Sequence, residues 1–203
     1  MASTPQLRRA TPADVPALRE LIAASVRGLS PGFYTAAQIE SALEHMFGVD
    51  SQLIADGTYY VVEAGAALVA AGGWSARRTL YGGDQWKKAE DPRLDPSVEP
   101  ARIRAFFVHP ARARQGLARR LFAECARAAW EAGFRRFELL ATLPGEPLYA
   151  ALGFTVIERF DVPLPGGIEL PCARMGRTID APPPPEQAAR AGSPTPTSRD
   201  AVG

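Results

Sequence analysis

The chain has 203 residues, of which 46% are hydrophobic, and its 23 basic and 22 acidic residues give a formal net charge of +1. This length fits one globular domain with an ordinary core and leaves residues over for a tail. The even charge balance gives no sign of a nucleic-acid partner. No window approaches the ~18 apolar residues of a membrane span, and the N-terminus lacks the apolar core of a signal peptide, so we expect a cytoplasmic protein without a membrane partner.

The first elements are a strand and a helix. A short strand is predicted at residues 6–10. Thr11, Pro12 and Asp14 then supply an N-cap, a first-turn proline and an early carboxylate. They predict a helix that runs to about Val26.

A second helix and a hairpin follow. The helix is predicted to begin at Thr35, because apolar residues then recur at helical spacing. Residues 59–63 and 67–72 predict two strands joined by a turn at Ala64 and Gly65. Both strands are apolar almost throughout, which is typical of strands that are covered on both faces.

Residues 75–100 have no clear periodicity. A segment of this length inside a domain is usually either disordered or a functional lid. Tyr81 and Trp86 favour a lid over a site.

The second half alternates strand and helix and closes with a hairpin. Strands and a short helix are predicted at residues 103–108, 136–141, 144–152, 154–162 and 168–177, and a longer helix follows the first of these and runs to about Ala132. The whole order, β α α β β β α β α β β, predicts an α/β (α+β) fold with a mixed sheet and helices on its faces.

The end of the chain has a different composition. Residues 180–203 are rich in Pro, Ser and Ala and contain almost no large apolar side chain, so we predict a disordered tail after a domain of residues 1–179. The two cysteines, Cys125 and Cys172, lack metal-ligand spacing and are interpreted as buried thiols. We expect no metal site.

The stretch at residues 108–122 suggests a phosphate site. A buried strand leads through a proline-containing loop into a helix whose start includes the small residues Ala113, Gly116 and Ala118, with Arg112 and Arg114 nearby. Helix N-terminal amides have no partner inside the helix, and the helix dipole favours anions there. An ordinary amphipathic helix with solvated arginines gives the same pattern, and both interpretations can hold together.

Two motifs carry a family resemblance. Ala113-Arg114-Gln115-Gly116-Leu117-Ala118 resembles the acetyl-CoA signature of the GNAT superfamily of N-acetyltransferases, Gln/Arg-x-x-Gly-x-Gly/Ala. Tyr149-Ala150-Ala151-Leu152-Gly153-Phe154 is similar to the family's Tyr-x-x-x-Gly-Phe element. The resemblance covers residues 6–178. It implies a mostly antiparallel sheet of about seven strands flanked by about four helices.

The resemblance also implies a cosubstrate and the residues that bind it. The cosubstrate is acetyl-CoA, held mainly by backbone amides at a strand bulge and at the loop before the helix. The implied binding residues are Phe107, Val108, Ala113, Arg114, Gln115, Gly116, Leu117, Ala118, Arg119 and Thr142. Two positions depart from the family pattern: Ala113 stands where the signature has Gln or Arg, and Thr142 stands where many relatives carry Asn.

For catalysis, the resemblance makes Tyr149 the general acid that protonates the departing thiolate. A tyrosine hydroxyl has an ordinary pKa near ~10, so it is protonated at neutral pH and can donate. Many relatives use a glutamate on the strand before the bulge as the base, but this strand has none. Glu63, Glu99, a water relay and the lack of any dedicated base all remain open as explanations of how the amine loses its proton.

The acceptor is expected between the first two helices, the segment at residues 75–100 and the last hairpin. Its candidate contacts are Arg27, Tyr34, Tyr81 and Trp86. The resemblance implies an N-acetyltransferase that acts on a primary amine of a small molecule or peptide by direct attack. The alternative is a domain of the same fold that binds acyl-CoA as a sensor or interaction module without turnover. A homodimer is left open.

Overall fold

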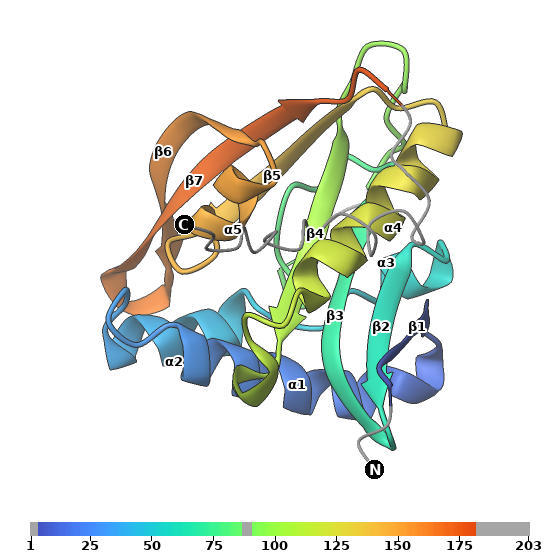
Figure 1. Cartoon of the computed structure of the whole chain (residues 1–203). Coiled ribbons are helices and arrows are strands. Elements are labelled where there is room, and N and C mark those ends of the chain that lie inside the picture. The colour runs from blue at the N-terminus through green and yellow to red at the C-terminus, as the bar shows by residue number, and fades with distance from the viewer. Residues whose placement is uncertain (1–3, 87–90, 182–203) are drawn as a thin grey trace, which may run out of the picture.

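The computed structural model describes residues 4–86 and 91–181 (Figure 1). The strands are β1 (Gln6–Arg9), β2 (Tyr59–Ala64), β3 (Ala67–Ser75), β4 (Ala101–Val108), β5 (Arg136–Thr142), β6 (Thr155–Leu164) and β7 (Ile168–Thr178). The α-helices are α1 (Val15–Leu29), α2 (Ala36–His45), α3 (Ser51–Ala55), α4 (Leu117–Glu131) and α5 (Glu146–Ala151). Three short 3-10 turns lie at Pro12–Asp14, Pro110–Arg112 and Pro165–Gly167.

All seven strands form one sheet in the order β1-β2-β3-β4-β5-β7-β6. Neighbouring strands are antiparallel except for β4 and β5, which are parallel. The mixed, mostly antiparallel sheet predicted from the sequence is therefore confirmed.

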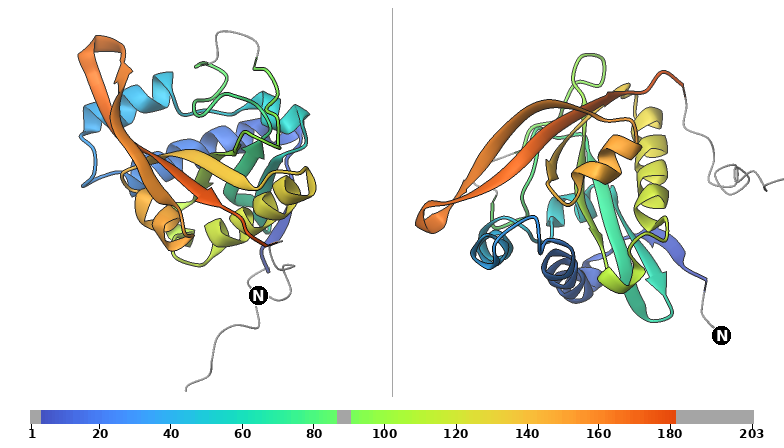
Figure 2. Two further views of the ribbon diagram at one scale, coloured as in Figure 1. Left: turned by 90° about the horizontal axis from the view of Figure 1, so that it is seen from above. Right: turned by 60° about the vertical axis from the view of Figure 1, so that its left-hand side comes forward.

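Helices cover both faces of the sheet, with α4 on one side and α1 and α2 on the other (Figure 2). Successive side chains of a strand point to opposite faces, and β2 shows the result. Tyr60 and Val62 pack in the cluster beneath α4, whereas Tyr59 and Val61 pack in the cluster beneath α1, α2 and α3. This double cover explains why the strand is apolar along most of its length.

The predicted order of elements holds, with one addition. The described part of the chain has five α-helices rather than about four, because α3 was missed. It is only five residues long, with Asp50 as its N-cap, and is too short to show a helical period. Cys125 and Cys172 are both buried free thiols, as expected.

Three expectations concern what the chain lacks or where it ends. Among the described residues, no helix is long and apolar enough to cross a membrane. The same residues contain no group of three His, Cys, Asp or Glu side chains placed to hold a metal ion. A disordered tail is predicted at residues 180–203, and residues 182–203 of it lie outside the described residues.

Candidate active site

The centre of the sheet opens where β4 and β5 separate (Figure 1). These parallel strands pair only at Ala101 with Phe137 and at Arg102 with Glu138. Beyond that point β4 pairs with β3 alone and β5 with β7 alone. A cavity of about 220 Å³ lies against this opening.

Five elements and several loop segments form the walls of this cavity, which we call the central cavity. Residues 103–108 of β4 lie along it, with Thr142 at the end of β5 and Tyr149 of α5. The end of α1 and the residues after α2 form the opposite wall, and residues 80–83 close one side. Ala118 in the first turn of α4 also lines it, so the cavity reaches the helix start that follows the loop expected to bind phosphate.

A bulge in β4 gives the cavity its shape. Arg104 pairs with Gly73 and Phe107 with Ala71, so two residues of β4 lie opposite Gly72 alone. One of them, Ala105, has a left-handed backbone with a φ of 55°. An L-residue pays about 1–2 kcal/mol for this conformation.

The bulge lies at Ala105 and Phe106, two residues before the predicted position at Phe107 and Val108. The cause is across the sheet, where Gly72 has no side chain and the Phe106 ring fills the space. A Cβ atom built on Gly72 would lie 2.7 Å from the Phe106 ring. Phe107 and Val108 still line the central cavity, and the Val108 amide donates to the Ser25 hydroxyl at 3.1 Å.

The loop before α4 has the backbone of an anion site. Arg114 and Gly116 have positive φ angles of 65° and 80°, and helix α4 begins directly after them. The first amide bonded into the helix ladder is that of Arg120, which donates to the Gly116 carbonyl at 3.0 Å. The amides just before it have no helical partner, as at every helix start. A Cβ atom at Gly116 would meet no protein atom within 4 Å, so the backbone there is open to approach.

Tyr149 stands on the other side of the opening. It is buried among aromatic rings, with Phe106 at 6.3 Å and Phe154 at 5.8 Å between ring centroids, both edge to face. Burial is the main cause that raises the pKa of Tyr149 above its ordinary value, and Cys125 adds to the shift. The hydroxyl is therefore protonated at neutral pH and can act as a donor.

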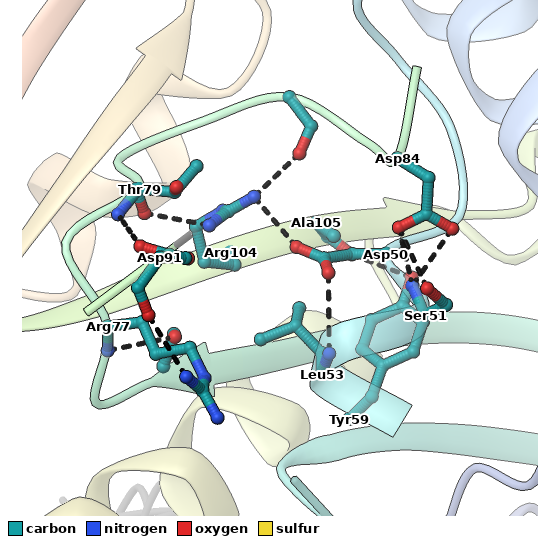
Figure 3. Close-up of polar contacts among 12 residues, drawn as sticks. Asp50, Ser51, Leu53, Tyr59, Arg77, Thr79, Asp84, Asp91, Arg104 and Ala105 are labelled. Atoms are coloured by element: carbon teal, nitrogen blue, oxygen red, sulfur yellow. Dashed lines mark hydrogen bonds and ion pairs between the residues drawn. The ribbon is translucent and has the colours of Figure 1, made fainter. Parts of the chain in front are cut away.

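A buried charge pair stands behind the bulge (Figure 3). The Arg104 side chain comes from β4 and is 2% exposed, and that of Asp50, the N-cap of α3, is fully buried. One Arg104 nitrogen donates to Asp50 at 2.8 Å and to the Gly82 carbonyl at 2.6 Å, and the other donates to the Thr79 carbonyl at 2.7 Å. Burial lowers the pKa of Arg104 from its ordinary value, and Asp50 opposes this shift.

A family model for the acetyltransferase (GNAT) domain matches residues 55–156, just over half of the chain. The chain belongs to the GNAT acetyltransferase family. Membership makes the protein an acyl-CoA N-acyltransferase. A search of curated proteins found no match.

Solved structures of GNAT proteins share the fold at low sequence identity. A GCN5-related N-acetyltransferase from Rhodopseudomonas palustris is 19% identical, with a TM-score of 0.64 over 88% of this chain and 98% of that chain. The putative acetyltransferase yncA from Salmonella typhimurium, solved with acetyl-CoA, is 19% identical, with a TM-score of 0.57 over 88% and 97%. The ribosomal-protein-S18-alanine N-acetyltransferase from Escherichia coli is 15% identical, with a TM-score of 0.55 over 88% and 96%.

The segment predicted as a lid, residues 75–100, includes residues 87–90, which lie outside the described residues. On both sides of these, described residues of the segment form hydrogen bonds or a salt bridge. Arg77 forms a salt bridge to Asp56 at 2.6 Å, and the Thr79 amide donates to Asp91 at 2.7 Å. Further along, the Gly83 amide donates to the Met46 carbonyl at 2.9 Å. In this GNAT domain, residues 80–83 of the segment thus form a wall of the central cavity, and hydrogen bonds and a salt bridge hold the residues on either side of them.

The four candidate acceptor contacts do not converge. Tyr81 lines the central cavity, and Trp86 packs against the Tyr81 ring at 5.4 Å without lining the cavity itself. Arg27 is exposed and pairs with Glu40 at 2.6 Å.

Tyr34 has a different position from the one expected. Its hydroxyl donates to the Pro171 carbonyl at 2.6 Å and accepts from the Leu143 amide at 2.9 Å. The side chain thus joins the loop between α1 and α2 to β7 and the end of β5, and it does not line the central cavity. Burial raises the pKa of Tyr34, which keeps this hydroxyl protonated as a donor.

Neither candidate base reaches the central cavity. Glu63 is on β2 and pairs with Arg8. Glu99 accepts from the Asp95 amide at 2.8 Å and lies 3.5 Å from Arg78. Among the described residues that line the cavity there is no carboxylate.

Sequence reasoning missed the Arg104–Asp50 pair. One signal was available, because Arg104 is a charged residue inside an otherwise apolar stretch of strand, where lone charges are rare unless paired. Its partner stands 54 positions earlier in the chain. No local pattern connects the two residues.

Proposed function

We propose that this protein transfers the acetyl group of acetyl-CoA to a primary amine of a small molecule or peptide by direct attack. The observation that carries the proposal is the central cavity, which joins three parts that this reaction needs. These are the start of α4, which follows the loop expected to bind phosphate, the bulge beside Tyr149, and an apolar end near Phe47. Family membership supports the reaction class, and the acceptor and the roles of individual residues are our inference.

In this proposal the phosphates of acetyl-CoA lie against the loop before α4. The residues that hold the cosubstrate are Phe107, Val108, Ala113, Arg114, Gln115, Gly116, Leu117, Ala118, Arg119 and Thr142. Backbone amides at a helix start bind anions without help from side chains. Ala113 has no polar side chain, so its position contributes through the backbone alone. The open backbone at Gly116 fits the close approach of a phosphate.

In the transfer, the amine nitrogen bonds to the acetyl carbon while the carbon–sulfur bond breaks. The departing thiolate takes a proton from the Tyr149 hydroxyl, the amine nitrogen gives its proton to water, and water returns a proton to Tyr149, so that the products are the N-acetyl amine and free CoA thiol. Because the pKa of Tyr149 is raised, donating a hydrogen bond to the developing thiolate contributes more than early proton release. The absence of a carboxylate among the described lining residues agrees with water as the proton acceptor.

The test is release of free thiol from acetyl-CoA across a panel of primary amines. The proposal expects at least one amine to raise the rate above hydrolysis and its N-acetyl product to appear by mass spectrometry. Tight CoA binding with no stimulation by any amine would favour the sensor alternative. No CoA binding at all would overturn the assignment of the loop before α4.

A further inference from the structure

We propose that Phe47 is the end wall of the acceptor part of the central cavity. By this role it restricts the acceptor to a short monoamine with an apolar body. The inference rests on the proposed function. It concerns which amine is used rather than whether transfer occurs.

Phe47 is a partition between two cavities. A second cavity of about 600 Å³ lies beyond it, between α1, α2 and residues 84–85. Among the described lining residues, the two cavities share only Phe47 and Gly48. Removal of the Phe47 ring would therefore join them.

The partition is held in place by contacts on both sides. The Phe47 ring meets the Phe107 ring of β4 edge to face, with centroids 6.2 Å apart. The Phe47 amide donates to the Ala42 carbonyl at 2.7 Å, and its carbonyl accepts from the Gln85 side chain at 2.9 Å. Next to it, a Cβ atom at Gly48 would lie 2.4 Å from Gln85, so that side chain packs directly on the glycine. The ring is thus anchored to the end of α2, to β4 and to the loop.

The two sides of the partition differ in chemistry. Inside, most side chains that line the central cavity are apolar, including Leu29, Met46, Leu80 and Phe107, and Ser25, Ser30 and Tyr81 add hydroxyl groups. Outside, the second cavity carries charged side chains, which are Arg19, Arg27, Glu40, Glu44 and Asp84. An apolar body is therefore matched on the inside, and a charged or polar extension is matched only beyond the wall.

Charge excludes a second ammonium group from the inner side. Arg104 is the one charged side chain among the described residues that line the central cavity, and it is already bonded to Asp50. A second ammonium group would be taken out of water without a counter-ion, which is costly. The volume of about 220 Å³, which the acceptor shares with the thioester, is also small beside the roughly 300–1,000 Å³ of sites for drug-sized ligands.

The experiment compares chain length in the wild type, Phe47→Ala and Phe47→Leu. The panel is a series of linear 1-aminoalkanes from three to ten carbons, benzylamine, and the matching α,ω-diamines, assayed by thiol release with acetyl-CoA. Leu43→Ala is the matched control, because Leu43 lines the second cavity but not the central one. The same amines are titrated by calorimetry into each protein saturated with CoA, which measures the length limit independently of turnover.

In the wild type we expect kcat/KM to fall at least 10-fold beyond a limiting chain length and monoamines to exceed diamines of equal length. Phe47→Ala should extend the limiting chain length by several carbons and raise kcat/KM for the longest amines at least 10-fold. Phe47→Leu should have a limit between those of the wild type and Phe47→Ala, and Leu43→Ala should behave like the wild type. An unchanged limit in Phe47→Ala, or better use of diamines by the wild type, would overturn the inference.

The inference and the proposed function fail in different ways. If no amine releases thiol but Phe47→Ala binds longer amines than the wild type does in calorimetry, transfer is refuted and the partition stands. If transfer occurs and neither measurement shows a length limit that depends on Phe47, the partition is refuted and transfer stands. If no amine binds or reacts, both are refuted.

Discussion

Replacing Arg104 with methionine removes the cation of a buried pair and three hydrogen bonds in one step. The side chains of Arg104 and Asp50 are 2% and 0% exposed, so solvent screens their attraction little. Loss of one partner from such a pair costs about 3–5 kcal/mol, because the remaining charge stays buried. For a domain of this size that corresponds to a fall in Tm of about 6–20 °C.

A double variant separates the charge from the other bonds. In Arg104→Met/Asp50→Asn the buried charge is gone, while the Asn side-chain oxygen can still cap α3 at the Leu53 amide, which Asp50 now does at 3.3 Å. The carbonyls of Thr79 and Gly82 still lose their donor, which leaves a cost of about 1–3 kcal/mol. We therefore expect the double variant to be more stable than Arg104→Met alone.

Urea unfolding followed by circular dichroism measures the three free energies of unfolding. Asp50→Asn alone completes the cycle, and thermal scans give the Tm values. Two results would refute the reasoning: an Arg104→Met variant within about 1 kcal/mol of wild type, or a double variant less stable than Arg104→Met. The first would mean that the pair is neutral in the fold, and the second that Asp50 stabilises α3 by its charge rather than through Arg104.

Three further predictions concern Tyr149, the loop before α4 and stability in acid. Tyr149→Phe should lower kcat about 100-fold in the thiol-release assay with CoA affinity unchanged, and an unchanged rate would remove this residue as the acid. Gly116→Ala and its control Gly166→Ala both place alanine at a positive φ with no atom within 4 Å of the new Cβ. Each variant should therefore lose about 1–2 kcal/mol of stability. Calorimetry should show weaker CoA binding only for Gly116→Ala. Arg8 lowers the pKa of Asp14 to about 2 from an ordinary 3.8, so the stability that Asp14 contributes is present above pH 3.8 and is lost as pH falls towards 2. The gap between wild type and Asp14→Asn in urea unfolding should therefore be widest near neutral pH and close over that window, and a gap that grows on acidification would contradict the assignment.

The order of the helices and strands could be predicted because it follows from local sequence patterns. The apolar run of β2, the capping residues before α1 and the small residues before α4 each depend on neighbours in the chain. The open backbone before α4 was expected from the same kind of signal, the small residues Ala113, Gly116 and Ala118, and the structure places Gly116 in a left-handed conformation at the helix start. These features need no knowledge of distant contacts.

The features that the sequence did not reveal all depend on distant partners. The bulge falls at Ala105 because Gly72, more than 30 positions earlier, leaves room for the Phe106 ring. Tyr34 was predicted to contact the acceptor, but its hydroxyl bonds to residues more than 100 positions away, so its exposure could not be judged from its neighbours. A sequence pattern indicates which side chains are buried, but it does not show which distant residue each of them contacts.

The same distant contacts hold the central cavity in shape. The left-handed backbone at Ala105 is strained, and strain of this kind persists only where the surroundings determine it. The Tyr59 hydroxyl donates to the Ala105 carbonyl at 3.2 Å from one face of the sheet, and the Phe106 ring packs against Tyr149 on the other. Arg104, one residue before the strained position, fixes the strand to the cavity wall. Because these contacts are made within the protein, the cost of shaping the bulge falls on folding, and acetyl-CoA would meet a site whose backbone donors need little reorganisation.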